Sequence, residues 1–119
     1  MAYGNMLRQI RVEKEMTLRE LSTRTDIDNA YLSRVERETI KPPQDDELLD
    51  AINIALELDT KQSQKMKDQA SIDNKKFPTD IAEQIHKVDG FPMFLRTVSN
   101  KKLTNEKLQE LIKFINERY

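Results

Sequence analysis

The sequence predicts an all-α protein with two unequal helical parts. Hydrophobic residues recur at intervals of three and four along much of the chain, which is the spacing of an amphipathic helix. Thr and Asp residues that cap helices well precede several of these segments. Among the 119 residues 34% are charged, with two Gly and four Pro, a composition typical of a small helical protein.

The first helix is expected from about Asn5 to Glu15. Its residues at helical spacing are Met6, Leu7, Ile10 and Lys14.

The stretch from Met16 to Glu36 predicts two short helices joined by a tight turn. Thr17 is a good N-cap for the first of them, and Glu20 stands three residues later, which predicts a reciprocal capping box. Asp26 stands where the chain must turn, and Asp tolerates a positive φ better than most residues.

Asp28 is expected to cap the second helix of this pair, at about residues 29–37. Its inward face is Leu32 and Val35, and Ile27 packs at its entry. Two short helices around a turn, the second with a polar outer face, match the helix-turn-helix plan.

The prolines Pro42 and Pro43 end helical structure after the second helix of the pair. A fourth helix is expected to start at Gln44 or Asp45, because acidic residues in a first turn suit the helix dipole. Its apolar face is Leu48, Leu49, Ile52, Ala55 and Leu56.

A weaker fifth helix is expected to run to about Ala70, capped by Asp59 or Thr60. In it only Met66 and Ala70 face inward. The polar residues 71–76 are interpreted as a linker.

Residues 77–119 predict three further amphipathic helices. The first starts at Pro78 or Thr79, the second near Pro92, and the third after the N-cap Thr104. The domains are therefore expected at 1–70 and 77–119. The stripe on the third helix is either intramolecular core or a seam for a dimer or partner, and a dimer seam is favoured; it consists of Leu108, Leu111, Ile112 and Ile115.

Composition excludes several classes of site. There is no Cys, so disulfides and thiolate metal sites are excluded, and the one His, His86, is expected on a helix surface. We expect no catalytic residues, no metal site and no cofactor. No apolar run approaches the roughly 18–20 residues of a membrane span, and no signal peptide follows Met1, so a cytoplasmic protein without membrane contact is expected.

Charge is unevenly distributed. Residues 1–58 carry 8 Lys/Arg against 12 Asp/Glu, whereas residues 59–119 carry 12 against 9. A nucleic-acid binder usually has a basic face, and this distribution opposes that interpretation. Up to Lys41, however, the balance is 8 to 7, because the acidic cluster from Asp45 to Asp50 lies on a later segment.

Four features in residues 6–58 form a specific combination: Arg11, Thr17-Leu18-Arg19-Glu20-Leu21-Ser22, Tyr31-Leu32-Ser33-Arg34-Val35-Glu36 and Pro42-Pro43. With them the segment resembles the Xre/Cro-type helix-turn-helix regulators, the family of phage repressors and many small bacterial regulators. Two positions depart from the family pattern. Asp26 stands where the family prefers Gly, and Glu38 stands where a Glu-x-Gly ending is usual.

The resemblance implies a five-helix, phage-repressor-like domain that binds double-stranded DNA, with the helix at about 29–37 in the major groove. It assigns base reading to Asn29, Ala30, Tyr31 and Arg34. It assigns phosphate contacts to Thr17, Arg37 and Lys41. It also implies a structural ion pair between Arg11 and Glu36.

The function expected from the sequence is a sequence-specific transcriptional regulator, a repressor that binds operator DNA as a homodimer. The alternative is an antitoxin-like or adaptor protein whose C-terminal helices bind a protein partner. An enzyme is not expected, because no nucleophile, base and metal ligands occur together in a recognisable pattern.

Overall fold

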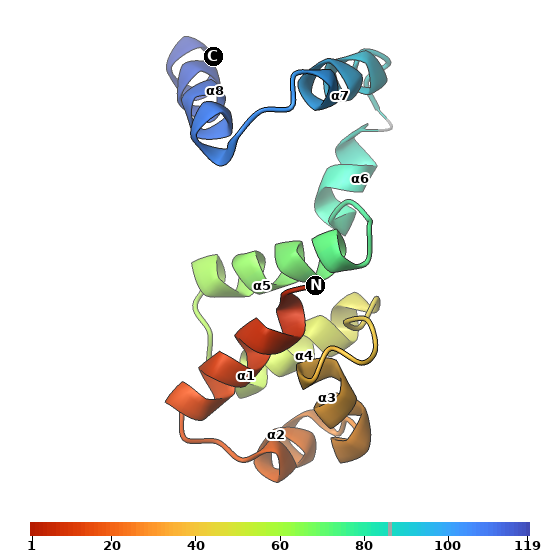
Figure 1. The fold of residues 1–119 in the computed structure, drawn as a ribbon, viewed down its shortest axis with the longest axis vertical. Coiled ribbons are helices and arrows are strands. Elements are labelled where there is room, and N and C mark those ends of the chain that lie inside the picture. The colour runs from red at the N-terminus through yellow and green to blue at the C-terminus, as the bar shows by residue number, and fades with distance from the viewer. Residues whose placement is uncertain (86) are drawn as a thin grey trace. The chain divides into compact units, whose positions relative to one another are not determined.

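The structure is a computed structural model that describes residues 1–85 and 87–119, and all regular structure in this part of the chain is helical, which confirms the all-α class (Figure 1). The chain divides into two compact units, Met1–Pro78 and Thr79–Tyr119. The helices are α1 (Tyr3–Glu13), α2 (Leu18–Thr25), α3 (Asn29–Glu36), α4 (Asp46–Ala55), α5 (Thr60–Asp73), α6 (Thr79–Ile85), α7 (Phe91–Asn100) and α8 (Asn105–Arg118).

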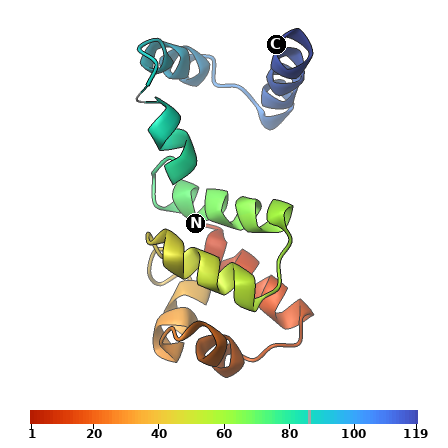
Figure 2. The ribbon, with the colours of Figure 1, turned by 180° about the vertical axis from the view of Figure 1, so that it is seen from behind.

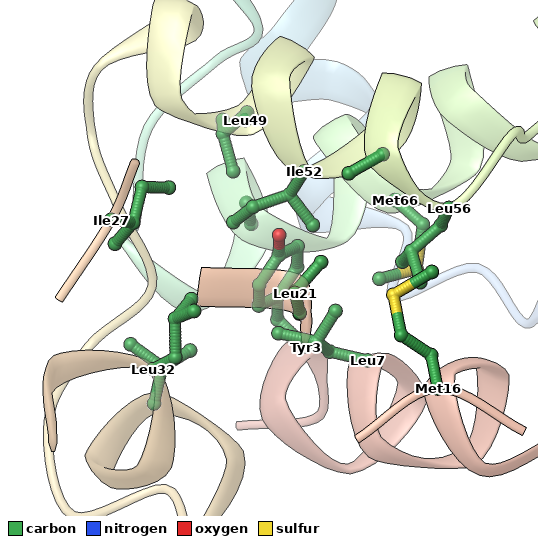
Figure 3. Packing of buried hydrophobic residues seen from close by; sticks show 13 residues of the cluster. Tyr3, Leu7, Met16, Leu21, Ile27, Leu32, Leu49, Ile52, Leu56 and Met66 are labelled. Carbon is green, nitrogen blue, oxygen red and sulfur yellow. The ribbon is translucent and has the colours of Figure 1, made fainter. Parts of the chain in front are cut away.

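The first unit packs five helices around one core. Helix α2 contacts α3 and α4, α1 contacts α3 and α5, and α4 contacts α5; Figure 2 shows α4 and α5 from behind. Every helix of the unit contributes apolar side chains to this core (Figure 3). Its fully buried residues include Leu7, Leu21, Leu32, Ile52 and Met66.

The inward faces of α4 and α5 are those that the spacing predicts. On α4 the buried residues include Leu49, Ile52 and Leu56, and on α5 they include Met66 and Ala70. Helix α4 begins after the N-cap Asp45, and α5 begins after Asp59, which forms a reciprocal capping box with Gln62. Hydrophobic periodicity therefore identifies these faces correctly.

Helix α1 differs from the prediction at its beginning. It starts at Tyr3 rather than Asn5, and Tyr3 is completely buried. The carboxylate of Asp73 accepts the backbone N–H groups of Ala2 at 2.8 Å and Tyr3 at 2.7 Å, so a residue far along the chain caps this helix. A distant cap of this kind leaves no local sequence signal.

The expected linker at residues 71–76 is wrong in its first half. Helix α5 continues to Asp73, and both Asp73 and Asn74 are buried. The side-chain amide of Asn74 donates to the carbonyl oxygens of Pro42 at 3.2 Å and Pro43 at 3.4 Å. These residues belong to the packed first unit because their polar side chains find backbone partners there.

The second unit consists of α6, α7 and α8. Thr104 caps α8 as predicted, accepting the N–H of Lys107 at 3.2 Å. In none of these three helices is a described residue buried. Helix α6 ends at Ile85, and His86, which the sequence places on a helix surface, lies outside the described residues.

Candidate nucleic-acid interface

The pair α2 and α3 is shaped by short-range polar bonds. Thr17 accepts the N–H of Glu20 at 3.1 Å, which is one half of the predicted capping box. Asp26 adopts the left-handed conformation, with φ 58°, as its place in the turn predicts. Asp28 then accepts the N–H of Tyr31 at 3.0 Å and caps α3. Both helix starts and the turn between them are thus set by local residues.

Side-chain hydroxyls close the turn. Ser22 Oγ donates to the carbonyl of Ile27 at 2.5 Å, and Thr25 Oγ1 donates to the carbonyl of Leu21 at 2.7 Å. The Ile27 side chain is buried in the core beneath these bonds. The carbonyl oxygens of Leu21 and Ile27 thus both accept hydrogen bonds from hydroxyl side chains of α2.

Helix α3 has a buried face and an exposed face. Leu32 and Val35 are buried, whereas most of the positions expected to read bases are exposed. The exposed residues of α3 and its C-cap are Asn29, Ala30, Arg34 and Arg37.

Tyr31 differs from the other expected base-reading residues. It is half-buried, and its ring packs against the hydrophobic core. Burial raises the pKa of the Tyr31 phenol, and the nearby positive charge of Arg34 partly opposes that rise. The hydroxyl therefore stays protonated at neutral pH and can donate a hydrogen bond beside the Arg34 guanidinium.

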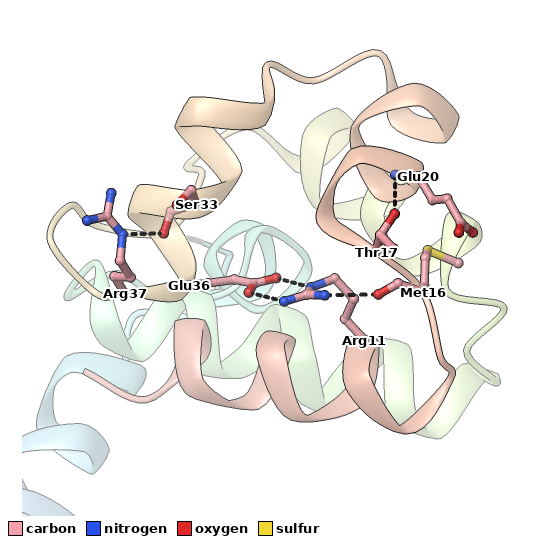
Figure 4. A network of polar contacts seen from close by, with 7 residues as sticks. All are labelled: Arg11, Met16, Thr17, Glu20, Ser33, Glu36 and Arg37. Carbon is pink, nitrogen blue, oxygen red and sulfur yellow. Dashed lines mark hydrogen bonds and ion pairs between the residues drawn. The ribbon is translucent and has the colours of Figure 1, made fainter.

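Arg11 and Glu36 form a bidentate ion pair between α1 and α3 (Figure 4). Arg11 Nε lies 2.7 Å and Nη2 lies 2.8 Å from the two Glu36 carboxylate oxygens. A third bond runs from Arg11 Nη1 to the carbonyl of Met16 at 2.9 Å, directly before the N-cap Thr17. The hydrogen bonds to Glu36 raise the pKa of the Arg11 guanidinium. One arginine thus joins α1, the start of α2 and the end of α3.

The beginning of α1 lies very close to the end of α3. A Cβ atom added to Gly4 would stand 2.0 Å from the carbonyl oxygen of Val35, a separation that no side chain permits. The next residue, Asn5, donates its N–H to the carboxylate of Glu38 at 3.2 Å. Sequence reasoning does not single out Gly4, because it lies just before the predicted start of the first helix at Asn5.

Glu38 follows α3 in a left-handed conformation, with φ 59°. Its N–H donates to Val35 and that of Thr39 donates to Arg34, which is the Schellman arrangement that ends a helix. The departure from the family's Glu-x-Gly ending is therefore accommodated with the usual backbone geometry. Glu38 also supplies the carboxylate that binds Asn5, which a Gly could not do.

The expected phosphate-contacting residues are all exposed, but they lie apart. Figure 4 shows Thr17 and Arg37 at opposite ends of the Arg11–Glu36 network. Arg37 Nε donates to the carbonyl of Ser33 at 3.3 Å, and Lys41 is exposed in the connection that follows α3. A shallow hollow of about 320 Å³ lies on α2, lined by Thr17, Arg19, Glu20, Thr23 and Arg24.

Residues 1–85 and 87–119 contain neither a cluster of metal-ligating side chains nor a membrane-length apolar helix. In these ranges no group of three or more His, Asp or Glu residues is arranged to hold a metal ion. No helix there is both long and apolar enough to cross a membrane.

Residues 7–59 match the family model described as helix-turn-helix, which spans α2, α3 and α4 and most of α1. This part of the chain is an Xre/Cro-type helix-turn-helix domain. Neither the curated proteins nor the solved structures contained a match to the chain. The family is one of DNA-binding regulators, so the helix-turn-helix domain indicates DNA binding as its function.

Proposed function

We propose that this protein is a sequence-specific DNA-binding repressor that binds operator DNA as a homodimer, with α3 in the major groove. The observation that carries the proposal is the exposed face of α3. Asn29, Ala30 and Arg34 are exposed on a helix whose other face is buried in the core. The Arg11–Glu36 pair holds that helix against α1, so the reading face is presented on a rigid support.

Each exposed side chain of α3 suits a particular base edge. The fork of Arg34 matches the two acceptors of guanine, and the amide of Asn29 matches the donor and acceptor of adenine. Ala30 and the ring edge of Tyr31 offer apolar contact to a thymine methyl group. A bidentate contact of this kind is worth about 1–3 kcal/mol of discrimination against the wrong base.

Three further residues suit the phosphate backbone. Thr17 lies at the N-terminus of α2, where backbone N–H groups and the helix dipole favour an anion. Arg37 and Lys41 carry positive charge directly after the reading face. We assign them to phosphate contacts, which position the protein and make its affinity depend on salt.

The proposed dimer seam lies on α8, in the second unit. Leu111, Ile112 and Ile115 on α8 are 39%, 50% and 44% exposed, and Leu108 beside them is half-buried. Isolated helices of this length are marginal in water, so burying this exposed apolar stripe against a second copy would stabilise α8. A second copy doubles the number of base pairs read, which is how helix-turn-helix proteins gain specificity.

The test of DNA reading is a binding measurement on DNA from upstream of the gene, repeated across salt concentrations. We expect a site-specific complex with a steep salt dependence. Arg34→Ala should abolish selectivity at one base position, whereas Lys41→Ala should weaken binding to all sequences alike. Equal affinity of wild type and Arg34→Ala for every sequence would overturn the assignment of Arg34.

The test of the seam is the mass in solution of the full chain carrying Leu111→Glu and Ile115→Glu. We expect a monomer, because two carboxylates on each copy would be buried in the seam. The control is Ile54→Glu, since Ile54 is an apolar residue of α4 that is 76% exposed. A monomer from the control and a dimer from the seam variant would move the interface to the first unit.

A second candidate function is an antitoxin-like or adaptor protein. The exposed apolar residues of the second unit favour it, because the same faces suit a different protein. They include Met93 and Phe94 on α7 and Phe114 on α8, which are 72%, 50% and 55% exposed. A full chain that stays monomeric alone and forms a stoichiometric complex with a neighbouring gene product would favour this candidate.

A further inference from the structure

The last turn of α5 touches both segments that hold the end of α3. Asp73 binds the beginning of α1, and Asn74 binds the proline connection that follows α3. We propose that Asp73 and Asn74 are positioning residues of the DNA-reading surface, acting as a clamp on the C-terminal end of α3. The functional part of this inference rests on the proposed DNA binding.

The Asp73 half of the clamp is a buried carboxylate with three donors. Its Oδ2 accepts from the N–H groups of Ala2 and Tyr3, and its Oδ1 accepts from the side-chain amide of Gln69 at 2.9 Å. Gln69 lies one helical turn earlier on α5, so it orients the carboxylate toward α1. Because charged acceptors make strong hydrogen bonds, the start of α1 is held firmly on α5.

The beginning of α1 passes this constraint to α3. Gly4 lies against the carbonyl oxygens of Val35 and Glu36, with no room for a Cβ between the backbones. Asn5 is bound to Glu38, the residue that ends α3. Since the two backbones are in direct contact, a shift of the start of α1 displaces the end of α3.

The Asn74 half of the clamp acts on the chain beyond α3. Its amide donates to the carbonyls of Pro42 and Pro43, and both prolines are buried. Lys76 adds a hydrogen bond to the side chain of Gln44 in the same connection. Consecutive residues at one end of α5 therefore bind two segments next to the end of α3, namely the start of α1 and the proline connection.

The test compares full-length Asp73→Ala and Asn74→Ala with Asp59→Ala. Asp59 caps the opposite end of α5, so its loss weakens the same helix without touching α1 or the proline connection. DNA binding is measured at a temperature at which circular dichroism shows every variant to be folded. If the aligned pose of α3 falls to about a tenth of molecules, the dissociation constant of the clamp variants rises about tenfold, and that of the control does not.

A second readout does not depend on DNA. The N–H groups of Glu38 and Thr39 close the end of α3, and we expect their hydrogen exchange to accelerate in the clamp variants but not in Asp59→Ala. Asp73→Asn keeps one acceptor oxygen and is expected to restore part of both properties. Such graded rescue distinguishes positioning from a general loss of stability.

Each outcome decides the inference. Clamp variants that match Asp59→Ala in both affinity and exchange would overturn it. If wild type selects no DNA sequence, the proposed function fails, and the exchange measurement still decides the clamp. Should Asp73→Ala not fold, Asn74→Ala and Asp73→Asn supply the comparison, because each removes fewer hydrogen bonds.

Discussion

Thr17 and Thr104 have the same role in the two units. Each is an N-cap whose hydroxyl accepts the N–H of the third residue that follows, at 3.1 Å in one case and 3.2 Å in the other. The helix after Thr17 buries Leu21 completely. In the helix after Thr104 no residue is buried, although Leu108 and Ile112 recur at helical spacing. Local capping residues thus start a helix in both units, but only the helix of the first unit has a buried residue.

The difference shows what hydrophobic spacing predicts. Spacing identifies which residues share a face, as Ile52 and Leu56 do on α4, and it does not identify what covers that face. In the first unit α4 packs against α2 and α5. In the second unit the apolar residues of α8 remain 39% to 55% exposed from Leu111 to Ile115. The first unit therefore has a buried core of its own, whereas no described residue of α6, α7 or α8 is buried.

The largest effect is expected from breaking the Arg11–Glu36 pair. Glu36→Gln leaves the Arg11 guanidinium poorly solvated without its counter-charge, and removing one member of a buried pair costs about 3–5 kcal/mol. Urea unfolding followed by circular dichroism measures the loss. The matched change in the second unit is Glu110→Gln at an exposed position, which should leave the transition of the first unit unchanged. A loss from Glu36→Gln no larger than the control's would show that the pair adds no stability.

The two glycines provide the next comparison. Gly4→Ala forces a Cβ against the Val35 carbonyl and is expected to cost the first unit about 3 kcal/mol, at the upper end of overpacking effects. Gly90→Ala meets nothing within 4 Å and should be tolerated. Thermal unfolding of the two variants measures the contrast. Similar midpoints for both would contradict the close approach of α1 and α3.

The lowered pKa of Asp73 predicts that the stability of the first unit depends on pH. Burial raises the pKa of its carboxyl, but the hydrogen bonds from Tyr3, Ala2 and Gln69 lower it by more. The pKa therefore lies below the ordinary 3.8. A depressed pKa stabilises the folded state above the unfolded value and loses that contribution as pH falls through the folded value. At neutral pH the free energy of unfolding of wild type should be about 2 kcal/mol larger than that of Asp73→Asn, a value typical of hydrogen bonds to charged groups.

The measurement for Asp73 is the free energy of unfolding of both proteins from neutral pH to below pH 3.8. The difference between them should shrink on acidification, because the carboxyl becomes neutral in the folded and unfolded chains alike. Asp80→Asn, at an exposed position of α6, is the control and should show no such trend. A difference that stays constant with pH would contradict the role of the Asp73 charge.

A smaller effect is expected from the two threonine caps. Thr17→Ala should lower the stability of the first unit by about 1 kcal/mol, the usual cost of losing an N-cap. Thr104→Ala should reduce helical content without shifting the unfolding midpoint of the first unit. Circular dichroism gives both quantities in one thermal scan. A midpoint shift from Thr104→Ala would mean that the two units unfold together.

The smallest effect is expected from the left-handed residues. Asp26→Gly should stabilise the first unit by about 0.5 kcal/mol, because Gly adopts a positive φ without the steric penalty of a side chain. Lys102, with φ 50° after α7, is the counterpart in the second unit, and Lys102→Gly should leave the midpoint of the first unit unchanged. A lower midpoint for Asp26→Gly would show that the Asp side chain stabilises the turn.

The sequence by itself determined the features that depend on residues a few positions apart. The caps Thr17 and Asp28, the turn at Asp26 and the inward faces of α4 and α5 are all predicted correctly. The exposed face of α3 follows from the same periodicity, since Leu32 and Val35 turn inward. Hydrogen bonds within four residues and a repeat of 3.6 need no knowledge of the chain path.

Only the tertiary structure decided the features that join distant segments. The bond from Tyr3 to Asp73 spans 70 positions, and the contact of Gly4 with Val35 exists because α1 crosses the end of α3. In the sequence only the family resemblance pairs Arg11 with Glu36. Their two hydrogen bonds form because α1 and α3 pack together. Which carboxylate caps which helix depends on the path of the whole chain, because a carboxylate binds any N–H group that the fold brings within reach.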